Sequence, residues 1–154
     1  MTETEMWQEL DRLCSLKAQG MLDIIRVLRE GHKKHHRVIC AIRHVAPDLV
    51  NQLYMNLDEA NPTREGNRYM LCYTTWAEAN SDMDLPEPCE DLPLDFVIGN
   101  ALSKPVIGGL LFNRHHPGKM MAIPKQFLGD AAMAINAYQK VFEGKSGPFM
   151  FNEK

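Results

Sequence analysis

The sequence predicts a single small α+β domain, with N-terminal helices, a mixed or antiparallel sheet of about four strands and a C-terminal helix. Its 154 residues are the size of one ordinary domain. Segments with the 3.6-residue period of amphipathic helices lie near both ends and in the middle. Short apolar or alternating segments typical of strands lie between them. Since no repeat or linker divides the chain, we expect residues 1–154 to form one domain.

The N-terminal part predicts two helices, over 4–17 and 21–30, because apolar residues recur there at helical spacing. Gly20 between them is either a break or a weak point within one long helix, and Gly31 is a helix-stop candidate. The next segment, 37–45, is rich in β-branched residues, as strands are. Its apolar residues also follow a 4-3-4 spacing that continues to position 49. From this spacing we predict a helix over 37–45.

Two strands are predicted next, over 53–57 and 69–74, and the turn residues between them favour an antiparallel hairpin. Thr75 and Glu78 have the spacing of a capping box, in which each side chain bonds the other residue's backbone amide. A short helix is therefore expected to begin there. Acidic residues and prolines over 80–92 indicate a surface loop.

The C-terminal half predicts a core-facing helix over 94–102 and a buried strand over 105–113 that contains Gly108-Gly109. A turn over 114–119 leads to a short strand over 120–123. A final helix is expected to begin near Pro124. The tail, 145–154, is expected to lie on the core or to contact a partner.

Charge is unevenly distributed along the chain. The net charge of −3 comes from 17 basic and 20 acidic residues. Residues 31–44 carry four basic residues and four histidines without an acid, and 78–95 carry seven acids without a base. Two solvated segments are the simplest interpretation. The alternative is that one segment meets a charged partner, or that the two meet across a dimer.

Several chemistries are excluded by the absence of their motifs. The sequence has no Walker-type phosphate loop, no G-x-G-x-x-G and no G-x-S-x-G. His32 and His36 have a spacing that suits two metal ligands on a helix, but Lys33, Lys34 and Arg37 beside them would repel a cation. We therefore predict no catalytic residue, cofactor or metal. The role of His32, His35 and His36 stays open.

The best candidate for a ligand or partner contact is the turn over 114–119. Arg114, His115, His116 and Lys119 gather four groups there that are cationic or can become so, and such a turn could hold an anion. Loops of this kind carry function more often than core positions do. An ordinary polar turn is the competing interpretation.

Localisation follows from the cysteines and the N-terminus. Cys14, Cys40, Cys72 and Cys89 form no C-x-x-C pair, and residues 1–9 carry three glutamates and no base, unlike a signal peptide. No segment has the length of apolar sequence that a membrane span needs. We expect a cytoplasmic protein with free thiols and no contact with membranes.

One family resemblance adds to these observations. Residues 73–79 read Tyr-Thr-Thr-Trp-Ala-Glu-Ala after an apolar strand, which resembles the strand and "F-T-S-x-x-x-A" helix start of the SseB-like, enhanced-serine-sensitivity family. The order of elements over 50–130 is similar to that family as well, although Tyr and Thr stand where Phe and Ser are typical. The resemblance implies a small α+β domain of bacterial origin. It carries over no reaction and no catalytic residues, and the chain has no room for the second domain of many relatives.

Together these points predict a non-catalytic bacterial module of the cytoplasm that binds a protein or small ligand, as a possible homodimer. One alternative is an enzyme or small-molecule sensor with its site near Arg114–Lys119. The other is a weak nucleic-acid binder that uses residues 31–44, which the net acidity disfavours.

Overall fold

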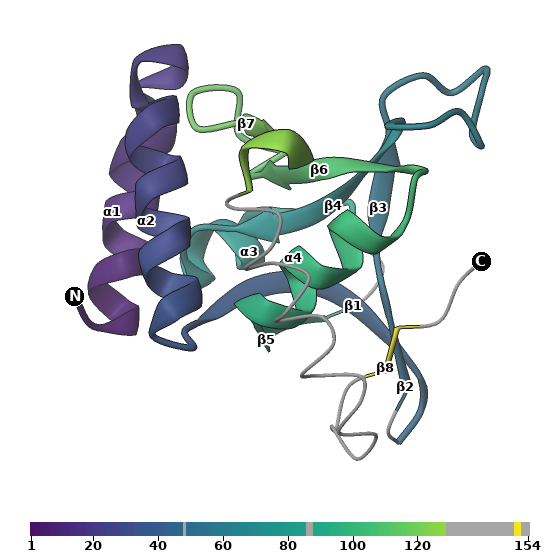
Figure 1. The fold of residues 1–154 in the computed structure, drawn as a ribbon, viewed down its shortest axis with the longest axis horizontal. Coiled ribbons are helices and arrows are strands. Elements are labelled where there is room, and N and C mark those ends of the chain that lie inside the picture. Colours follow the sequence, from purple (N-terminus) through teal and green to yellow (C-terminus); the bar gives the residue numbers. More distant parts are fainter. Residues whose placement is uncertain (48, 86–87, 129–149, 152–154) are drawn as a thin grey trace.

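A computed structural model of the chain describes residues 1–47, 49–85, 88–128 and 150–151. Two helices open the fold, α1 (Glu3–Ser15) and α2 (Met21–Lys33), joined by a 3₁₀ turn over Lys17–Gly20. They lie side by side at one end of the molecule (Figure 1). Both predicted helices are confirmed, and of the two interpretations of Gly20 the structure shows the break.

Gly31 does not end α2, contrary to the prediction, because the helix continues to Lys33. A Cβ at Gly31 would lie 2.4 Å from Met6 Sδ and 3.3 Å from Leu94 Cδ2. The glycine therefore permits close packing of α2 against α1 and the helix that begins at Leu94, instead of marking a helix end.

The helix predicted over 37–45 is wrong, since these residues form strand β1 (Arg37–Ala46). Five consecutive residues, 38–42, are buried. A strand covered on both faces buries every residue, so apolar and polar residues do not alternate along its sequence. The remaining spacing of apolar residues then resembled that of a helix. β1 pairs antiparallel with β2 (Leu49–Gln52), β4 (Arg68–Tyr73) and β5 (Cys89–Pro93).

The predicted hairpin is confirmed: β3 (Tyr54–Asn56) pairs antiparallel with β4. Helix α3 (Trp76–Ser81) begins after Thr75, as predicted. The acidic segment 80–92 is not a loop throughout, because residues 89–92 belong to β5. The acidic residues of β5 are tolerated in a strand because β5 pairs with β1, which carries basic residues.

Helix α4 (Leu94–Ser103) and strands β6 (Ile107–Phe112) and β7 (Met121–Pro124) follow the predicted order. β6 runs parallel to β4 and antiparallel to β7. Gly109 has φ +155°, and a Cβ there would lie 1.9 Å from the carbonyl oxygen of Ile123. The register with β4 shifts beside it, so glycine is required where β6 passes close to β7.

The sheet is mixed, with the order β7-β6-β4-β1-β2-β8, while β3 joins β4 and β5 joins β1. The class α+β is confirmed, but the described residues form eight strands and not about four. β8 (Met150–Phe151) pairs in parallel with β2. After β7 the structure shows a 3₁₀ turn, Lys125–Phe127. The remainder of the predicted C-terminal helix lies outside the described residues.

The core occupies both faces of the sheet. On one face, α1, α2 and α4 pack on alternate residues of the central strands, among them Cys40, Cys72 and Phe112. On the other face, Ala79 of α3 and neighbouring loop residues cover Ile39 and Tyr73. Figure 1 shows α4 lying across the sheet and α3 near the ends of β4 and β6. These ends position the candidate site.

The basic and acidic segments of the sequence meet each other within one chain. The guanidinium of Arg37 lies 3.3 Å from the Asp91 carboxylate, and His44 lies 3.0 Å from Glu90. The antiparallel register of β1 and β5 brings these groups together. Contacts within one chain therefore account for the basic segment 31–44 and the acidic segment 78–95, without a dimer in which the two segments meet.

Candidate functional site

The candidate site lies where β4 and β6 end. Because these neighbouring strands are parallel, their carboxyl ends reach the same edge of the sheet, where sites commonly form. Thr74 and Asn113 follow the two strands and bond each other: Thr74 N–H donates to Asn113 Oδ1 (3.2 Å), and Asn113 Nδ2 donates to Thr74 Oγ1 (3.0 Å). Asn113 has φ +55° and also donates to the Lys119 carbonyl. It therefore shapes the 114–119 loop.

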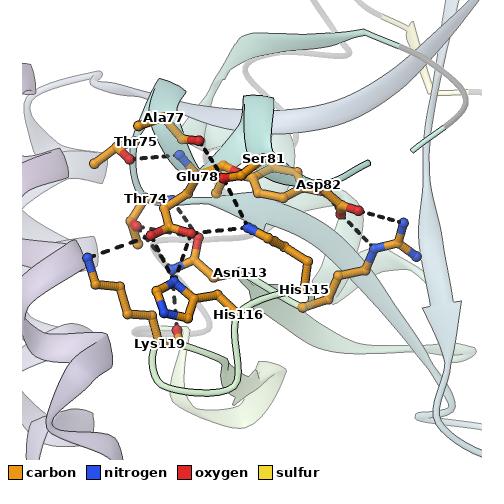
Figure 2. A network of polar contacts seen from close by, with 12 residues as sticks. Thr74, Thr75, Ala77, Glu78, Ser81, Asp82, Asn113, His115, His116 and Lys119 are labelled. Carbon is orange, nitrogen blue, oxygen red and sulfur yellow. Dashed lines mark hydrogen bonds and ion pairs between the residues drawn. The ribbon is translucent and has the colours of Figure 1, made fainter. Parts of the chain in front are cut away.

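Glu78 is the centre of the site, although its sequence spacing predicts another role. Half of the predicted capping box forms, since Thr75 Oγ1 accepts from Glu78 N–H at 3.1 Å. The Glu78 side chain does not return to Thr75. Its carboxylate contacts His115 Nε2 and His116 Nδ1, each at 3.1 Å, and lies 3.6 Å from Lys119 Nζ (Figure 2). Glu78, His115, His116 and Lys119 together form the Glu78 cluster.

The cluster is tied to α1 through Asp11. Lys119 Nζ lies 2.6 Å from Asp11 Oδ2, and Thr74 Oγ1 donates to Asp11 Oδ1 at 2.6 Å. The bond to Asp11 raises the pKa of Lys119, and Glu78 adds to the effect. Lys119 is therefore a cation held between two carboxylates.

A second carboxylate, Asp82, lies at the end of α3. Arg114 donates to both of its oxygens, at 2.8 and 3.3 Å, and the hydroxyl of buried Tyr73 donates to it as well. Burial alone would raise the pKa of Asp82, but the bonds from Arg114 and Tyr73 outweigh this and hold that pKa below its usual value. Burial and the bond to Asp82 raise the pKa of Tyr73. Both groups therefore keep their protonation states at neutral pH.

The geometry does not support a serine nucleophile. Ser81 Oγ lies 3.5 Å from His115 Nε2, the same nitrogen that contacts Glu78. A Ser-His-acid relay needs the serine and the acid on opposite ring nitrogens. Ser81 Oγ instead donates to the carbonyl of Ala77 at 2.6 Å.

The side chains of the site do not form a metal centre. Within the described ranges, no three His, Cys, Asp or Glu side chains are arranged to hold a metal ion. Lys119 beside Glu78 also disfavours a cation in the Glu78 cluster.

The other histidines serve contacts between elements. His32 Nδ1 lies 2.6 Å and His35 Nδ1 3.2 Å from the two oxygens of Asp95 at the start of α4. His36 follows the end of α2, and its Nε2 lies 3.0 Å from the Met1 carbonyl. His32 and His36 therefore do not form the metal-ligand pair that their spacing allowed.

All four cysteines are free, as predicted, and burial raises the pKa of three of them. The value is about 12 for Cys14 and about 11 for Cys89. Cys40 is fully buried, its Sγ lies 3.8 Å from Cys72 Sγ across β1 and β4, and its pKa is raised well above the usual value. Thiols held in the protonated form are poor nucleophiles.

The surface around the Glu78 cluster combines apolar and polar groups. Trp76 is 39% exposed and packs edge-on against Trp7, with ring centroids 6.4 Å apart. Met120, next to Lys119, is 42% exposed, and the His116 side chain is 44% exposed. Large side chains around paired charges are the composition of many recognition surfaces.

The structure brings all four predicted contact residues to this edge, although not as one group. His115, His116 and Lys119 converge on Glu78 (Figure 2). The Arg114 side chain instead pairs with Asp82. Sequence reasoning missed the carboxylates of Glu78, Asp82 and Asp11. For Glu78 and Asp82 the available signal was the excess of acids over 78–95, which names no partner for either of them, and Asp11 lies outside that segment.

No helix among the described residues is both long and apolar enough to cross a membrane. Comparisons with protein-family models, with curated proteins and with solved structures give no match for this chain. The function of the chain is therefore inferred from the geometry of the site.

Proposed function

We propose that the chain is a non-catalytic binding or regulatory module of the bacterial cytoplasm, and that it recognises its partner through the surface around the Glu78 cluster. The observation that carries this proposal is the pairing of the loop side chains with carboxylates from other elements. Arg114 faces Asp82, Lys119 faces Asp11, and the loop's two histidines face Glu78. A partner can cover charges that are already paired without leaving any of them buried and alone.

The exposed side chains around the pairs supply the contact area. Trp76 and Met120 are residues of the kinds enriched in interface cores, and Trp is frequent among residues that dominate binding energy. His116, whose side chain is 44% exposed, adds a hydrogen-bonding group. A protein partner, including a second copy of the chain, fits such a surface. The family resemblance over 50–130 is part of the same proposal, since that family also has no reaction to assign.

The alternative of an enzyme or small-molecule sensor near Arg114–Lys119 is supported by one feature: the loop side chains converge instead of diverging into solvent. The nucleic-acid alternative is less well supported, because two groups of 31–44 face acids of the same chain, Arg37 with Asp91 and His44 with Glu90.

The test compares wild type with a double variant, His116→Ala plus Lys119→Ala, and with a control, His44→Ala plus Arg26→Ala, on a different surface. Light scattering measures self-association, and thermal shift measures binding of free amino acids, small carboxylates and inorganic phosphate. We expect a dimer or a ligand response that the site variant loses and the control keeps. A response unchanged in the site variant contradicts the proposed surface, and turnover of a tested compound supports the enzymatic alternative.

A further inference from the structure

We propose that Cys40 and Cys72 are an oxidation site, in which a hydroperoxide converts the buried pair of thiols to a disulfide that joins β1 to β4. Both cysteines are fully buried in the central strands. Neither belongs to the Glu78 cluster, so the inference does not depend on the proposed binding function. It rests on the strand register, the distance between the two sulfurs and the positions of the other two cysteines.

The strand register places the two cysteines directly opposite each other. β1 and β4 are antiparallel, and Cys40 is the pairing partner of Cys72. Directly opposed residues of an antiparallel pair have Cα atoms about 4.5 or about 5.5 Å apart. Both separations lie within the range found for disulfides, about 4.4–6.8 Å. The backbone therefore permits the bond without a movement of either strand.

The two sulfurs are in contact in the reduced chain. Cys40 Sγ lies 3.8 Å from Cys72 Sγ, and both side chains belong to the core that α1, α2 and α4 cover. A disulfide needs the sulfurs about 2.05 Å apart. Rotation of the two side chains about their Cα–Cβ bonds can bring the sulfurs to this distance.

The other two cysteines are not placed to compete for this bond. Cys89 of β5 pairs with Ala41, the residue after Cys40. Because successive residues of a strand point to opposite faces, Cys89 lies on the other face of the sheet, where it packs on the second core cluster. Cys14 lies on α1 in the same helical turn as Asp11, and so toward the candidate site. Oxidation of the folded chain should therefore join Cys40 to Cys72.

Gln52 supplies a polar group beside the buried pair. It lies opposite Ile42, two residues along β1 from Cys40 and therefore on the same face. Its Oε1 accepts from Asn100 Nδ2 at 3.4 Å, while its Nε2 is buried and has no hydrogen-bond partner among the residues that the structure describes. Burial raises the pKa of Cys40, and Gln52 opposes that rise. A thiolate formed at Cys40 therefore has a donor near it in the core.

The reaction with hydrogen peroxide balances in two steps. The Cys40 thiolate attacks one peroxide oxygen and the O–O bond breaks, which leaves a sulfenic acid on Cys40, and the departing hydroxide takes up the thiol proton as water. The Cys72 sulfur then attacks the Cys40 sulfur, the S–O bond breaks, and the hydroxyl leaves with the Cys72 proton as a second water. Two thiols are oxidised and one peroxide is reduced. Because the pair is buried, peroxide reaches it through local opening and the reaction should be slow.

The disulfide would fasten the strand that leads to the candidate site. Cys72 lies two residues before Thr74, and its carbonyl accepts from Asn113 N–H at 3.0 Å. The bond also closes the chain segment from 40 to 72, which restricts the unfolded chain and thereby stabilises the folded one. Oxidation should therefore raise the thermal stability of the chain.

The test treats the reduced full chain with hydrogen peroxide in native buffer and maps its peptides without reductant. We expect the peptide that contains Cys40 to be linked to the peptide that contains Cys72. The double variant Cys14→Ala plus Cys89→Ser retains only the proposed pair, so its two free thiols should disappear. Its Tm should rise by about 5–10 °C and return to the reduced value with dithiothreitol.

The matched control adds Cys72→Ser to that double variant and should show neither an intramolecular bond nor a rise in Tm. Peptide mapping of the wild-type chain does not depend on the folding of any variant. Wild type oxidised in denaturant should give several pairings, whereas the folded chain should give one. Cys40 and Cys72 that stay free thiols in the folded wild type after prolonged treatment, or a disulfide between any other pair, would overturn the proposal.

Discussion

Arg114 holds Asp82 through two hydrogen bonds, at 2.8 and 3.3 Å, and so fixes the start of the 114–119 loop to the end of α3. The same carboxylate accepts a bond from Tyr73, which is fully buried. One acid therefore joins the end of β4, the end of α3 and the loop after β6. The stability of the chain should depend on contacts of this kind.

Asp82→Asn should destabilise the chain by about 3 kcal/mol. The change removes the negative charge opposite Arg114 and weakens the acceptor of Tyr73, and breaking a buried ion pair on one side typically costs about 3–5 kcal/mol. Chemical denaturation of both proteins measures the difference. Asp84→Asn, at an exposed acid two residues later, is the matched control and should change stability by less than about 0.5 kcal/mol. Equal effects of the two substitutions would refute the role given to Asp82.

Asp95 should make stability depend on pH in the acid range. Burial would raise the pKa of Asp95, but the bonds from His32 and His35 outweigh this and lower it. Because the folded pKa lies below the unfolded value of about 3.9, the stabilisation is complete above about pH 4–5. It is lost as the pH falls through the lower, folded pKa.

The Asp95→Asn variant should therefore be less stable than wild type. The difference in unfolding free energy between the two should be largest at pH 6 and smallest below about pH 3. The amide also removes a negative charge from the first turn of α4, where it favours the helix by about 0.3–1 kcal/mol. A difference from wild type that grows as the solution is acidified would contradict the account of Asp95.

Gly109→Ala should destabilise the chain severely, by about 3 kcal/mol or more. Its φ of +155° and the 1.9 Å approach to the Ile123 carbonyl oxygen leave no place for a methyl group, and backbone cannot yield as a side chain does. Gly118→Ala is the control, since a Cβ there meets only the His116 ring, at 3.5 Å and beyond. Thermal unfolding should show a large loss of Tm for the first variant and little change for the second.

The thiols should react slowly in the folded chain. At pH 8 a disulfide reagent such as Ellman's reagent should modify Cys89 first, because its pKa of about 11 is below that of Cys14, about 12, and it is only partly buried. In the chain unfolded by denaturant, all four thiols should react with the reagent at one fast rate. Cys89→Ser should remove the first phase of the folded reaction. Rapid modification of Cys40 or Cys72 without unfolding would contradict their burial.

Local sequence patterns predicted the structure correctly where the pattern concerns one face of a single helix or strand. The stripe in α4 and the hairpin of β3 and β4 follow from periodicity and turn residues, and the structure confirms both. The same reasoning failed for 37–45, because β1 is covered on both sides and lacks the alternation by which strands are recognised. It failed for β5 because the acids that resemble a loop are stabilised by Arg37 and His44 of β1.

The candidate site was predictable only in part, for a related reason. Arg114, His115, His116 and Lys119 are adjacent in the sequence, so their clustering is visible there. Glu78 lies 37 positions before His115, and only the parallel pairing of β4 and β6 brings the two together. The capping-box spacing assigned the Glu78 side chain to Thr75, whereas tertiary contacts with two histidines and a lysine prevail over that local bond.

The central claim is that Glu78 holds the 114–119 loop against α3, and amide hydrogen exchange in Glu78→Gln tests it most directly. The loop amides His116 N–H and Lys119 N–H are bonded within the loop, to the carbonyls of Asn113 and His116, so they report its order. We expect protection of both to fall about tenfold in Glu78→Gln, while the amides of β6 and all amides of Asp84→Asn keep their wild-type rates. Unchanged protection of the loop in Glu78→Gln would contradict the account.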